Sequence, residues 1–278
     1  MPVYRHYDQA ALDAQYDNRA MVPNFADHLA AWKQGSDAAR RDLPHRADLA
    51  YGPHRRERID FFPAGPAAPL HLFIHGGYWR AMDKLDFAFP APGFIEAGIA
   101  YAALGYPLAP EVSLDEILAS THRAMNWIFD HAAELTIDET RIIVSGHSAG
   151  GHLAAMLRAD AVLGPKLRGT VAISGLYDLE PIRLSYLNAD LDLDAKEARR
   201  VSPIRFPPPQ GGGAVLAVGG KESDEYHRQQ TDYHKILIAE GIAAESIDLP
   251  GQDHFSILQA LARPGEVVFD AVAGFARS

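Results

Sequence analysis

Short apolar runs alternate with longer amphipathic stretches along most of the chain. The runs with the length and composition of β-strands lie at residues 47–51, 58–62, 70–74, 99–104, 141–145, 170–174, 214–218 and 245–249. Helical periodicity occurs between them, near residues 86–97, 114–133, 152–158, 225–240 and 255–273. This alternation predicts an α/β protein with a mostly parallel sheet of about eight strands, helices on both faces, and a site at the carboxyl ends of the strands.

Two segments fall outside this alternation. Residues 1–45 are predicted to form a helical N-terminal lid, and residues 181–210 a cap-like insertion that ends in a proline-rich and then glycine-rich loop. The length of 278 residues would allow one large domain or two smaller ones. Because no Pro/Gly/Ser linker divides the chain cleanly, we expect a single domain over residues 1–278.

The composition is that of an ordinary soluble globular protein, with 47% hydrophobic and 22% charged residues. The formal net charge of -10 and the scattered basic residues argue against a nucleic-acid surface. No stretch approaches the ~18 to 20 apolar residues needed to cross a bilayer, and no signal-peptide pattern opens the chain. We therefore expect a cytoplasmic protein that acts on a small-molecule substrate and has no nucleic-acid or membrane partner. The sequence leaves open whether the protein forms a homodimer.

A motif of G-x-S-x-G spacing directly follows the apolar run at 141–145: Gly146-His147-Ser148-Ala149-Gly150. This spacing after a strand is typical of a nucleophile elbow, in which the serine sits on a strained turn and glycines let the next helix pack closely. A strand-to-helix turn whose serine only caps the helix has the same short pattern. The choice between a nucleophile and a cap therefore depends on the other strand ends.

Two glycines follow the apolar run at 70–74, within the sequence His75-Gly76-Gly77-Tyr78-Trp79. Glycines at this point let backbone N–H groups turn toward a ligand, as an oxyanion hole requires. The predicted donors are the amides of Gly77, Tyr78 and Ala149, with Gly76 as a further candidate. The other interpretation is a plain glycine turn with Trp79 buried in the core.

Carboxylates and a histidine follow the last two predicted strands. We predict Glu222 as the acid that orients a catalytic histidine, with Asp224 as its rival. Acidic residues at a helix start, such as Asp224, are often present only because they stabilise the helix dipole. His254 lies on the loop after residues 245–249 and is the predicted general base. The chain order serine, acid, histidine is that of the α/β-hydrolase architecture.

No cofactor or metal ion is expected from the motifs. The chain has no cysteine, and His75, His147 and His152 lack the spacing of a zinc motif. Neither a G-x-x-x-x-G-K loop nor a strand-initial G-x-G-x-x-G is present, which leaves nucleotide binding without support.

The motifs at 75–79 and 146–150, together with Asp253-His254-Phe255, resemble those of the α/β-hydrolase group that contains kynurenine formamidase (arylformamidase), a relative of the hormone-sensitive-lipase-like esterases. The H-G-G-Y-W form is the specific part, and residues 12–19, 106–110 and 174–179 add to the likeness. The resemblance implies a central sheet, a small cap or N-terminal lid, a Ser-acid-His triad and no cofactor. The group usually has Asp-Ser where this chain has Glu222-Ser223, and a glutamate can fill the same role.

The function expected from these residues is that of a serine hydrolase, and the resemblance makes a small arylformamide such as N-formylkynurenine the leading substrate. A carboxylesterase, an amidase or a carbamate hydrolase would use the same groups. A small-molecule binding protein on the hydrolase scaffold is a third class, and such a protein is expected to lack one of the catalytic groups. Trp79, Tyr177 and Tyr16 are candidates for an aromatic substrate pocket, although aromatic residues at these positions could equally belong to the core.

Overall fold

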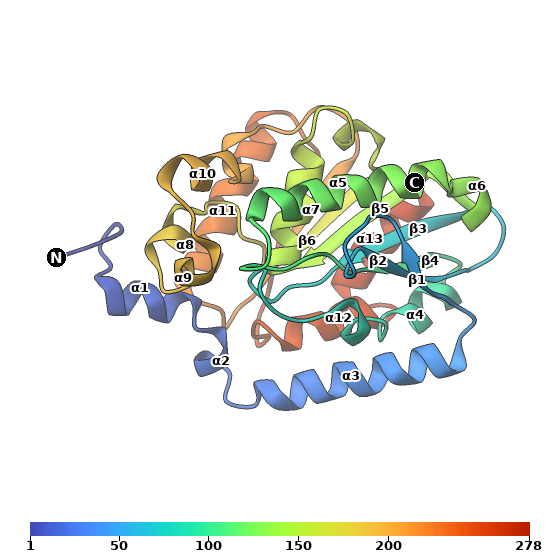
Figure 1. Ribbon diagram of the computed structural model, residues 1–278, viewed down its shortest axis with the longest axis horizontal. Helices are drawn as coiled ribbons and strands as arrows, with labels where there is room; N and C mark the ends of the chain where they lie inside the picture. The colour runs from blue at the N-terminus through green and yellow to red at the C-terminus, as the bar shows by residue number, and fades with distance from the viewer.

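The computed structural model describes all residues 1–278 and places eight strands in one sheet (Figure 1). The strands are β1 Arg46–Ala50, β2 Arg58–Phe62, β3 Ala68–Ile74, β4 Ala100–Leu104, β5 Ile137–His147, β6 Gly169–Ile173, β7 Gly213–Gly219 and β8 Ala244–Leu249. Their order across the sheet is β1-β2-β4-β3-β5-β6-β7-β8. β2 is antiparallel to both of its neighbours. The other six strands after it in this order, β4, β3, β5, β6, β7 and β8, run parallel to one another. The predicted α/β-hydrolase fold is confirmed.

Helices cover both faces of the sheet (Figure 1). One face carries α5 Leu114–Asp130, α7 Ala149–Ala159 and α11 Asp224–Ala239, and the opposite face carries α3 Phe25–Asp42, α4 Ala91–Glu96 and α13 Val267–Arg277. The short helices are α1 Gln9–Tyr16, α2 Asn18–Met21, α6 Ala132–Leu135, α8 Glu180–Leu184, α9 Asn188–Leu191, α10 Ala195–Arg200 and α12 Gln259–Ala262. Four 3₁₀ turns complete the set: η1 Lys84–Asp86, η2 Gly164–Lys166, η3 Pro203–Arg205 and η4 Ser256–Leu258.

The apolar strands are buried because both faces of the sheet are covered. All seven residues of β3 are buried. Leu72 belongs to the core beneath α5 and α7, whereas its neighbour Phe73 belongs to the core beneath α4 and α13. Successive side chains of a strand point to opposite faces, so a strand covered on both faces must be apolar throughout. This is the pattern seen in the sequence at residues 70–74.

Two predicted helices are shorter than their periodicity indicates. The helix predicted over 255–273 is interrupted between α12 and α13, where Pro264 precedes Gly265 at a φ of 87°. The helix predicted over 86–97 begins only at Ala91, because Pro90, the N-cap residue, disfavours helical backbone in the residue before it. In both cases a proline sets the boundary.

The two segments outside the βα alternation are helical and lie beside each other. α1, α2 and α3 lie within residues 1–45, and α9, α10 and η3 lie within residues 181–210. The side-chain amide of Gln9 donates to the carbonyl oxygen of Leu184 at 2.9 Å, and the amide of Tyr186 donates to Asp13 at 2.8 Å. Their action as a lid and a cap over a site stays a prediction.

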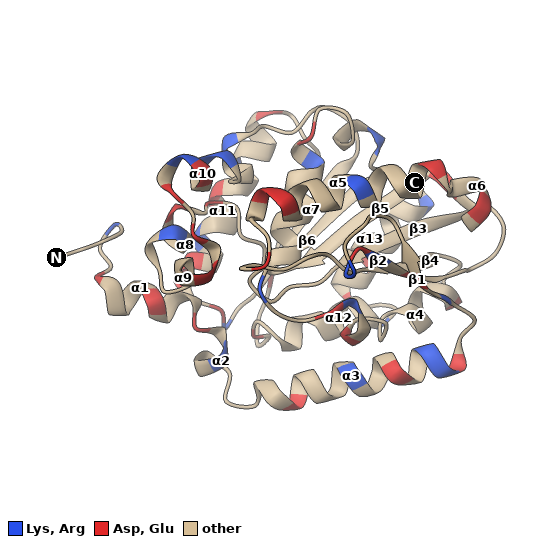
Figure 2. Ribbon diagram, in the orientation of Figure 1, with Lys and Arg blue, Asp and Glu red and all other residues tan.

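Acidic and basic side chains are interspersed along the helices, as the alternating colours on α3 show (Figure 2). No helix combines the length and the apolar character needed to span a bilayer.

A buried chain of hydrogen bonds joins the loop after β3 to α7 and to the segment after α10. The Trp79 indole N–H donates to Nδ1 of His152 at 3.2 Å, and Nε2 of His152 contacts the carbonyl oxygen of Val201 at 2.7 Å. Since Nδ1 accepts, the proton of the neutral ring must be on Nε2. Burial lowers the pKa of His152 to about 4, so the ring stays neutral.

This burial predicts a loss of stability in mild acid. Burial also lowers the pKa of His71 to about 3 and that of His75 to about 4, whereas an unfolded histidine has a pKa of 6.5. Below pH 6.5 the unfolded chain binds protons that the folded chain excludes, so the free energy of unfolding should fall as the pH drops toward about 4. Each such histidine contributes up to about 1.4 kcal/mol per pH unit.

Urea unfolding between pH 4 and 8 measures this slope. His152→Gln should flatten the slope, because glutamine can replace both hydrogen bonds and does not titrate. His6→Gln, at an exposed position, is the matched control and should leave the slope unchanged. A His152→Gln protein with the wild-type slope would contradict the assignment.

Candidate active site

Ser148 lies at the turn between β5 and α7, with φ 56° and ψ −118°. A positive φ is strained for a residue with a Cβ and persists only where the surrounding structure enforces it. Here the amide of Ser148 donates to the carbonyl oxygen of Ile173 at 2.8 Å, which ties the turn to the end of β6. The serine side chain makes no cap hydrogen bond with α7. This is the geometry of a nucleophile elbow and not that of a helix cap.

The glycines of the motif are required by backbone packing. A Cβ added to Gly146 would collide with the carbonyl oxygen of Gly150, and one added to Gly150 would collide with that of Ile74. Neither obstacle is a flexible side chain, so any larger residue would push α7 away from β3 and β5.

The loop after β3 passes directly beside Ser148. A Cβ added to Gly76 would lie 3.1 Å from Cβ of Ser148. The next three residues, Gly77, Tyr78 and Trp79, have φ values of 101°, 49° and 57°. The amides of Gly77 and Tyr78 donate to no group of the protein. Ala149 is the first residue of α7, where backbone N–H groups lack partners within the helix. The predicted oxyanion donors are thus next to the serine.

The structure brings Glu222, and not Asp224, to His254. Nδ1 of His254 lies 2.6 Å from Oε2 of Glu222, and both side chains are buried. The other carboxylate oxygen, Oε1, accepts hydrogen bonds from the Ser174 hydroxyl at 2.6 Å and from the Gly219 amide at 2.7 Å. Asp224 is exposed at the first position of α11. Ser174 was not predicted, although a polar residue at the end of a buried strand is the signal that would have identified it.

Ser148 and His254 line one cavity of about 280 Å³. No hydrogen bond joins the two side chains in this structure. The remaining lining residues are Tyr16, Asp17, Asn18, Arg19, Gly77, Tyr78, Arg80, Ala81, Met82, His147, Tyr186 and Phe255. Five of them, from Tyr16 to Arg19 and Tyr186, come from the two segments outside the βα alternation. The cavity therefore lies at the carboxyl ends of the strands, as predicted, and these segments complete it.

His147 fixes the backbone of the loop that carries His254. Its Nε2 lies 2.7 Å from the carbonyl oxygen of His254, and the two rings are 4.6 Å apart between centroids. A carbonyl oxygen can only accept, so Nε2 of His147 carries the proton. Burial holds the pKa of His147 well below its usual value, and nearby His254 lowers it further. His147 is therefore a neutral residue beside the predicted base.

Four residues at the cavity form a hydrogen-bond network in which the donor of each bond can be assigned. They are Tyr16, Asn18, Tyr78 and Tyr226. The Tyr78 hydroxyl donates its only proton to the carbonyl oxygen of Tyr16 at 2.8 Å. Its oxygen must then accept from Nδ2 of Asn18 at 3.0 Å and from the Tyr226 hydroxyl at 2.8 Å. Nδ2 of Asn18 also donates to Tyr226 at 2.9 Å. The loop beside Ser148 is thereby fixed to the N-terminal segment and to α11.

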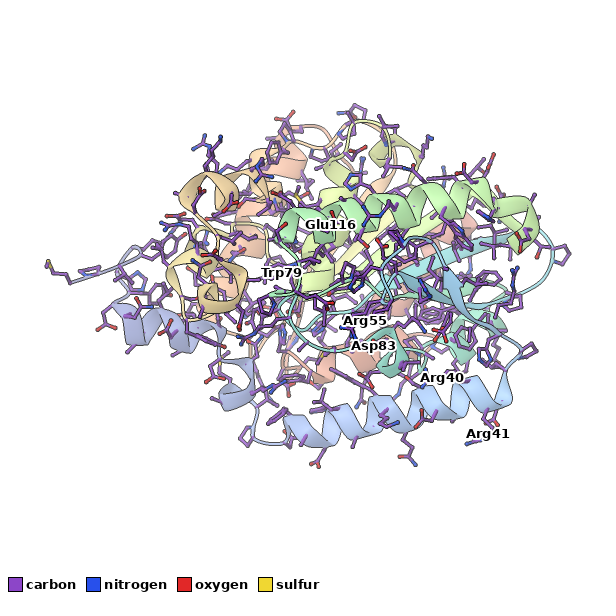
Figure 3. All side chains as sticks on the ribbon, viewed as in Figure 1. Arg40, Arg41, Arg55, Trp79, Asp83 and Glu116 are labelled. Carbon is purple, nitrogen blue, oxygen red and sulfur yellow. The ribbon has the colours of Figure 1, made fainter.

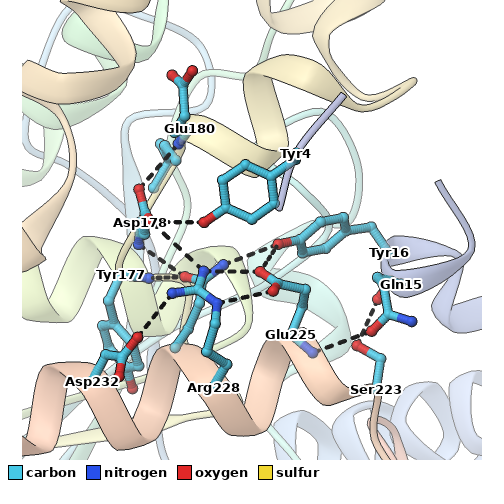
Figure 4. Close-up of polar contacts among 12 residues, drawn as sticks. Tyr4, Gln15, Tyr16, Tyr177, Asp178, Glu180, Ser223, Glu225, Arg228 and Asp232 are labelled. Atoms are coloured by element: carbon cyan, nitrogen blue, oxygen red, sulfur yellow. Dashed lines mark hydrogen bonds and ion pairs between the residues drawn. The ribbon is translucent and has the colours of Figure 1, made fainter. Parts of the chain in front are cut away.

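A second polar network anchors the N-terminal segment to α11 (Figure 4). The Tyr16 hydroxyl donates to Glu225 at 3.1 Å, and Glu225 pairs with Arg228 at 2.8 Å. The Ser223 hydroxyl donates to the carbonyl oxygen of Gln15 at 2.7 Å. Residues 15–18 are thus held on the loop that also carries Glu222.

Two of the three predicted pocket aromatics do not line the cavity. Trp79, labelled in Figure 3, is fully buried, and its indole N–H donates to His152 of α7. Tyr177 is also fully buried, and its ring stacks on Tyr233 with centroids 4.5 Å apart. The pocket assignment is wrong for both. Tyr16 does line the cavity, together with the unpredicted Tyr186 and Phe255.

No three His, Asp or Glu side chains are arranged so that they could hold a metal ion.

Comparison with known proteins places the chain among hydrolases. A family model described as BD-FAE matches residues 62–163, which include the loop after β3 and the elbow. Kynurenine formamidase of Danio rerio is 31% identical over 94% of this chain and 94% of its own length. The chain belongs to the kynurenine formamidase family. The Salmo salar enzyme of that name is 30% identical over 89% of this chain and 88% of its own length.

A solved structure agrees with this family membership. A candidate thioesterase from Silicibacter sp. tm1040 superposes with a TM-score of 0.85 at 31% identity, covering 94% of this chain and 98% of the other. As a member of the kynurenine formamidase family, the chain is an α/β-hydrolase that hydrolyses small substrates.

The packing beneath Ser148 predicts that Gly150→Ala is strongly destabilising. The new methyl group would meet the Ile74 carbonyl, and overpacking of this kind costs about 1–3 kcal/mol of unfolding free energy. Gly274→Ala is the matched control, because a Cβ there meets nothing within 4 Å in the exposed middle of α13. It should stabilise by roughly 0.5–1 kcal/mol. Urea unfolding of both variants measures this, and an unaltered Gly150→Ala protein would refute the packing argument.

Proposed function

We propose that the chain is a serine hydrolase that cleaves a small arylformamide, with Ser148 as nucleophile, His254 as general base and Glu222 as the acid that orients it. The hydrogen bond of 2.6 Å between Glu222 and His254, on a cavity shared with Ser148, is the observation that carries the proposal. Oε1 of Glu222 already accepts hydrogen bonds from Ser174 and Gly219, which leaves Oε2 to accept from His254. Glu222 is therefore fixed as an acceptor of the Nδ1 proton.

In the first half of the reaction, Ser148 attacks the formyl carbon while its proton passes to Nε2 of His254. Glu222 accepts the Nδ1–H bond, which keeps Nε2 free as the base and stabilises the imidazolium that forms. The carbonyl oxygen becomes an oxyanion and accepts hydrogen bonds from the backbone amides of Gly77, Tyr78 and Ala149. A fixed donor of this kind is worth about 3 to 4 kcal/mol in the transition state.

In the second half, the C–N bond breaks and His254 gives its proton to the leaving amine. Ser148 then carries the formyl group as an ester. Water attacks this ester, His254 takes the proton of the water, and the serine leaves with that proton restored. The products are formate and an arylamine, and the enzyme returns to its starting state.

The arylformamide is supported by two observations. The Danio rerio and Salmo salar relatives are named for a formamide substrate and match most of the chain. The cavity of about 280 Å³ is lined by Tyr16, Tyr78, Tyr186 and Phe255, which offer aromatic surface to a substrate of about one ring.

Ester or thioester hydrolysis is the second candidate. The Silicibacter structure is named for thioester hydrolysis, and the same triad and oxyanion donors cleave esters, thioesters and amides alike.

Ser148→Ala should lower turnover by on the order of 10⁴-fold or more, because it removes the nucleophile. Steady-state assays with N-formylkynurenine and with short p-nitrophenyl esters measure the effect on both substrate classes. The wild type should have the larger kcat/KM for the formamide.

Undiminished hydrolysis by Ser148→Ala would refute the mechanism. A larger kcat/KM for the esters would refute the formamide assignment and favour the second candidate.

Glu222→Gln should lower kcat by about 10²- to 10⁴-fold. Ser174 and Gly219 hold the oxygen of the new amide, so its NH₂ group faces His254 and donates to Nδ1. The histidine proton then moves to Nε2, where the base is needed. Asp224→Asn removes the same charge at the start of α11 and is the matched control, with an expected change below about twofold. The reverse order of effects would assign the acid to Asp224.

A further inference from the structure

Arg19 is a cation on the cavity with no acidic partner in the protein. It lines the same cavity as Ser148 and His254, and it forms no ion pair or hydrogen bond. Its guanidinium lies over the ring of Phe25, with the guanidinium carbon 5.4 Å from the ring centroid. All five N–H donors of the guanidinium are free to bind an acceptor.

The other arginine on this cavity is already neutralised. Arg80 pairs with Asp190, and its guanidinium carbon lies 5.7 Å from the ring centroid of Tyr186. The carboxylate that lines the cavity is Asp17, and one of its oxygens accepts the Ala20 amide at 3.1 Å. Asp17 is not within ion-pair distance of Arg19. Arg19 is therefore the arginine of the cavity whose guanidinium is in no ion pair.

The backbone that carries Arg19 is fixed even though its side chain is exposed. Asn18, its neighbour, is buried and donates to Tyr78 and Tyr226. Tyr16 is fully buried and bonded to Glu225. The guanidinium is thus tethered to the cavity at a defined place, while the long side chain can adjust its reach.

We propose that Arg19 binds an anionic group, such as a carboxylate, on the part of the substrate away from the scissile carbonyl. The assignment rests on the proposed function in taking this cavity as the substrate site. A net charge of -10 repels anions in general, so selective uptake of an anionic substrate requires local positive charge at the cavity. A guanidinium also matches a carboxylate with two parallel N–H bonds. Arg19 is then a residue of specificity and not of catalysis.

The test uses two families of matched substrates. The first is formanilide beside its 2-, 3- and 4-carboxylate derivatives, and the second is phenyl acetate beside the corresponding carboxyphenyl acetates. Arg19→Gln should lower kcat/KM for the best carboxylated member of a family by about tenfold, with less than about twofold change for the neutral member. The loss should appear in KM more than in kcat, because the contact is equal in ground and transition states. Arg19→Lys should recover part of it.

Arg263→Gln is the control for net charge, since Arg263 is exposed, pairs with no acidic residue and does not line the cavity of Ser148 and His254. It should leave the ratio of carboxylated to neutral substrates unchanged. Equal losses on neutral and carboxylated members in Arg19→Gln, or no loss on either, would overturn the proposal. Because the aryl acetates report on Arg19 even if formamides are poor substrates, failure of this assignment is distinct from failure of the proposed function.

Discussion

The close packing of backbone against backbone beneath Ser148 is the constraint on which the site depends. The carbonyl oxygens of Ile74 and Gly150 occupy the space where side chains at Gly150 and Gly146 would lie. This approach brings the first turn of α7 against the end of β3, so that Ala149, Gly76 and the serine lie side by side. The sheet order, with β3 and β5 adjacent, is what makes the approach possible.

Backbone strain is concentrated at the same edge of the sheet. Tyr78, Trp79, Ser148 and Ser174 all have positive φ, and they follow β3, β5 and β6. Each such residue costs of order 1–3 kcal/mol, which the surrounding structure must offset. Burial of Trp79 and its bond to His152 hold the first of these turns, and the Ser174 bond to Glu222 holds the last. Ser174 thus both stabilises a strained turn and helps to orient Glu222, which contacts the candidate base His254.

Local patterns in the sequence were sufficient for the sheet, the elbow and the positions of Glu222 and His254. Each of these depends on a few consecutive residues at the end of an apolar run, and the parallel sheet brings the run ends together. The side-chain directions of Trp79 and Tyr177 could not be predicted, because they depend on the φ of a turn and on the space left by Tyr233. Asn18 and Tyr226 were missed for another reason: they are separated by 208 positions, and no local signal joins them.

That separation has a consequence for how the protein acquires activity. The cavity wall combines residues 16–19, near the start of the chain, with His254 and Phe255, near its end. Contacts between distant parts of a chain cost loop-closure entropy, and proteins rich in such contacts fold more slowly than proteins with local contacts. During synthesis the residues of the elbow and of strands β1 to β5 are translated before Glu222 and His254, so on the proposed mechanism a chain that ends before these two residues is inactive. Hydrolysis by this mechanism therefore requires residues from both ends of the sequence, whereas the turn at Ser148 consists of residues from its middle.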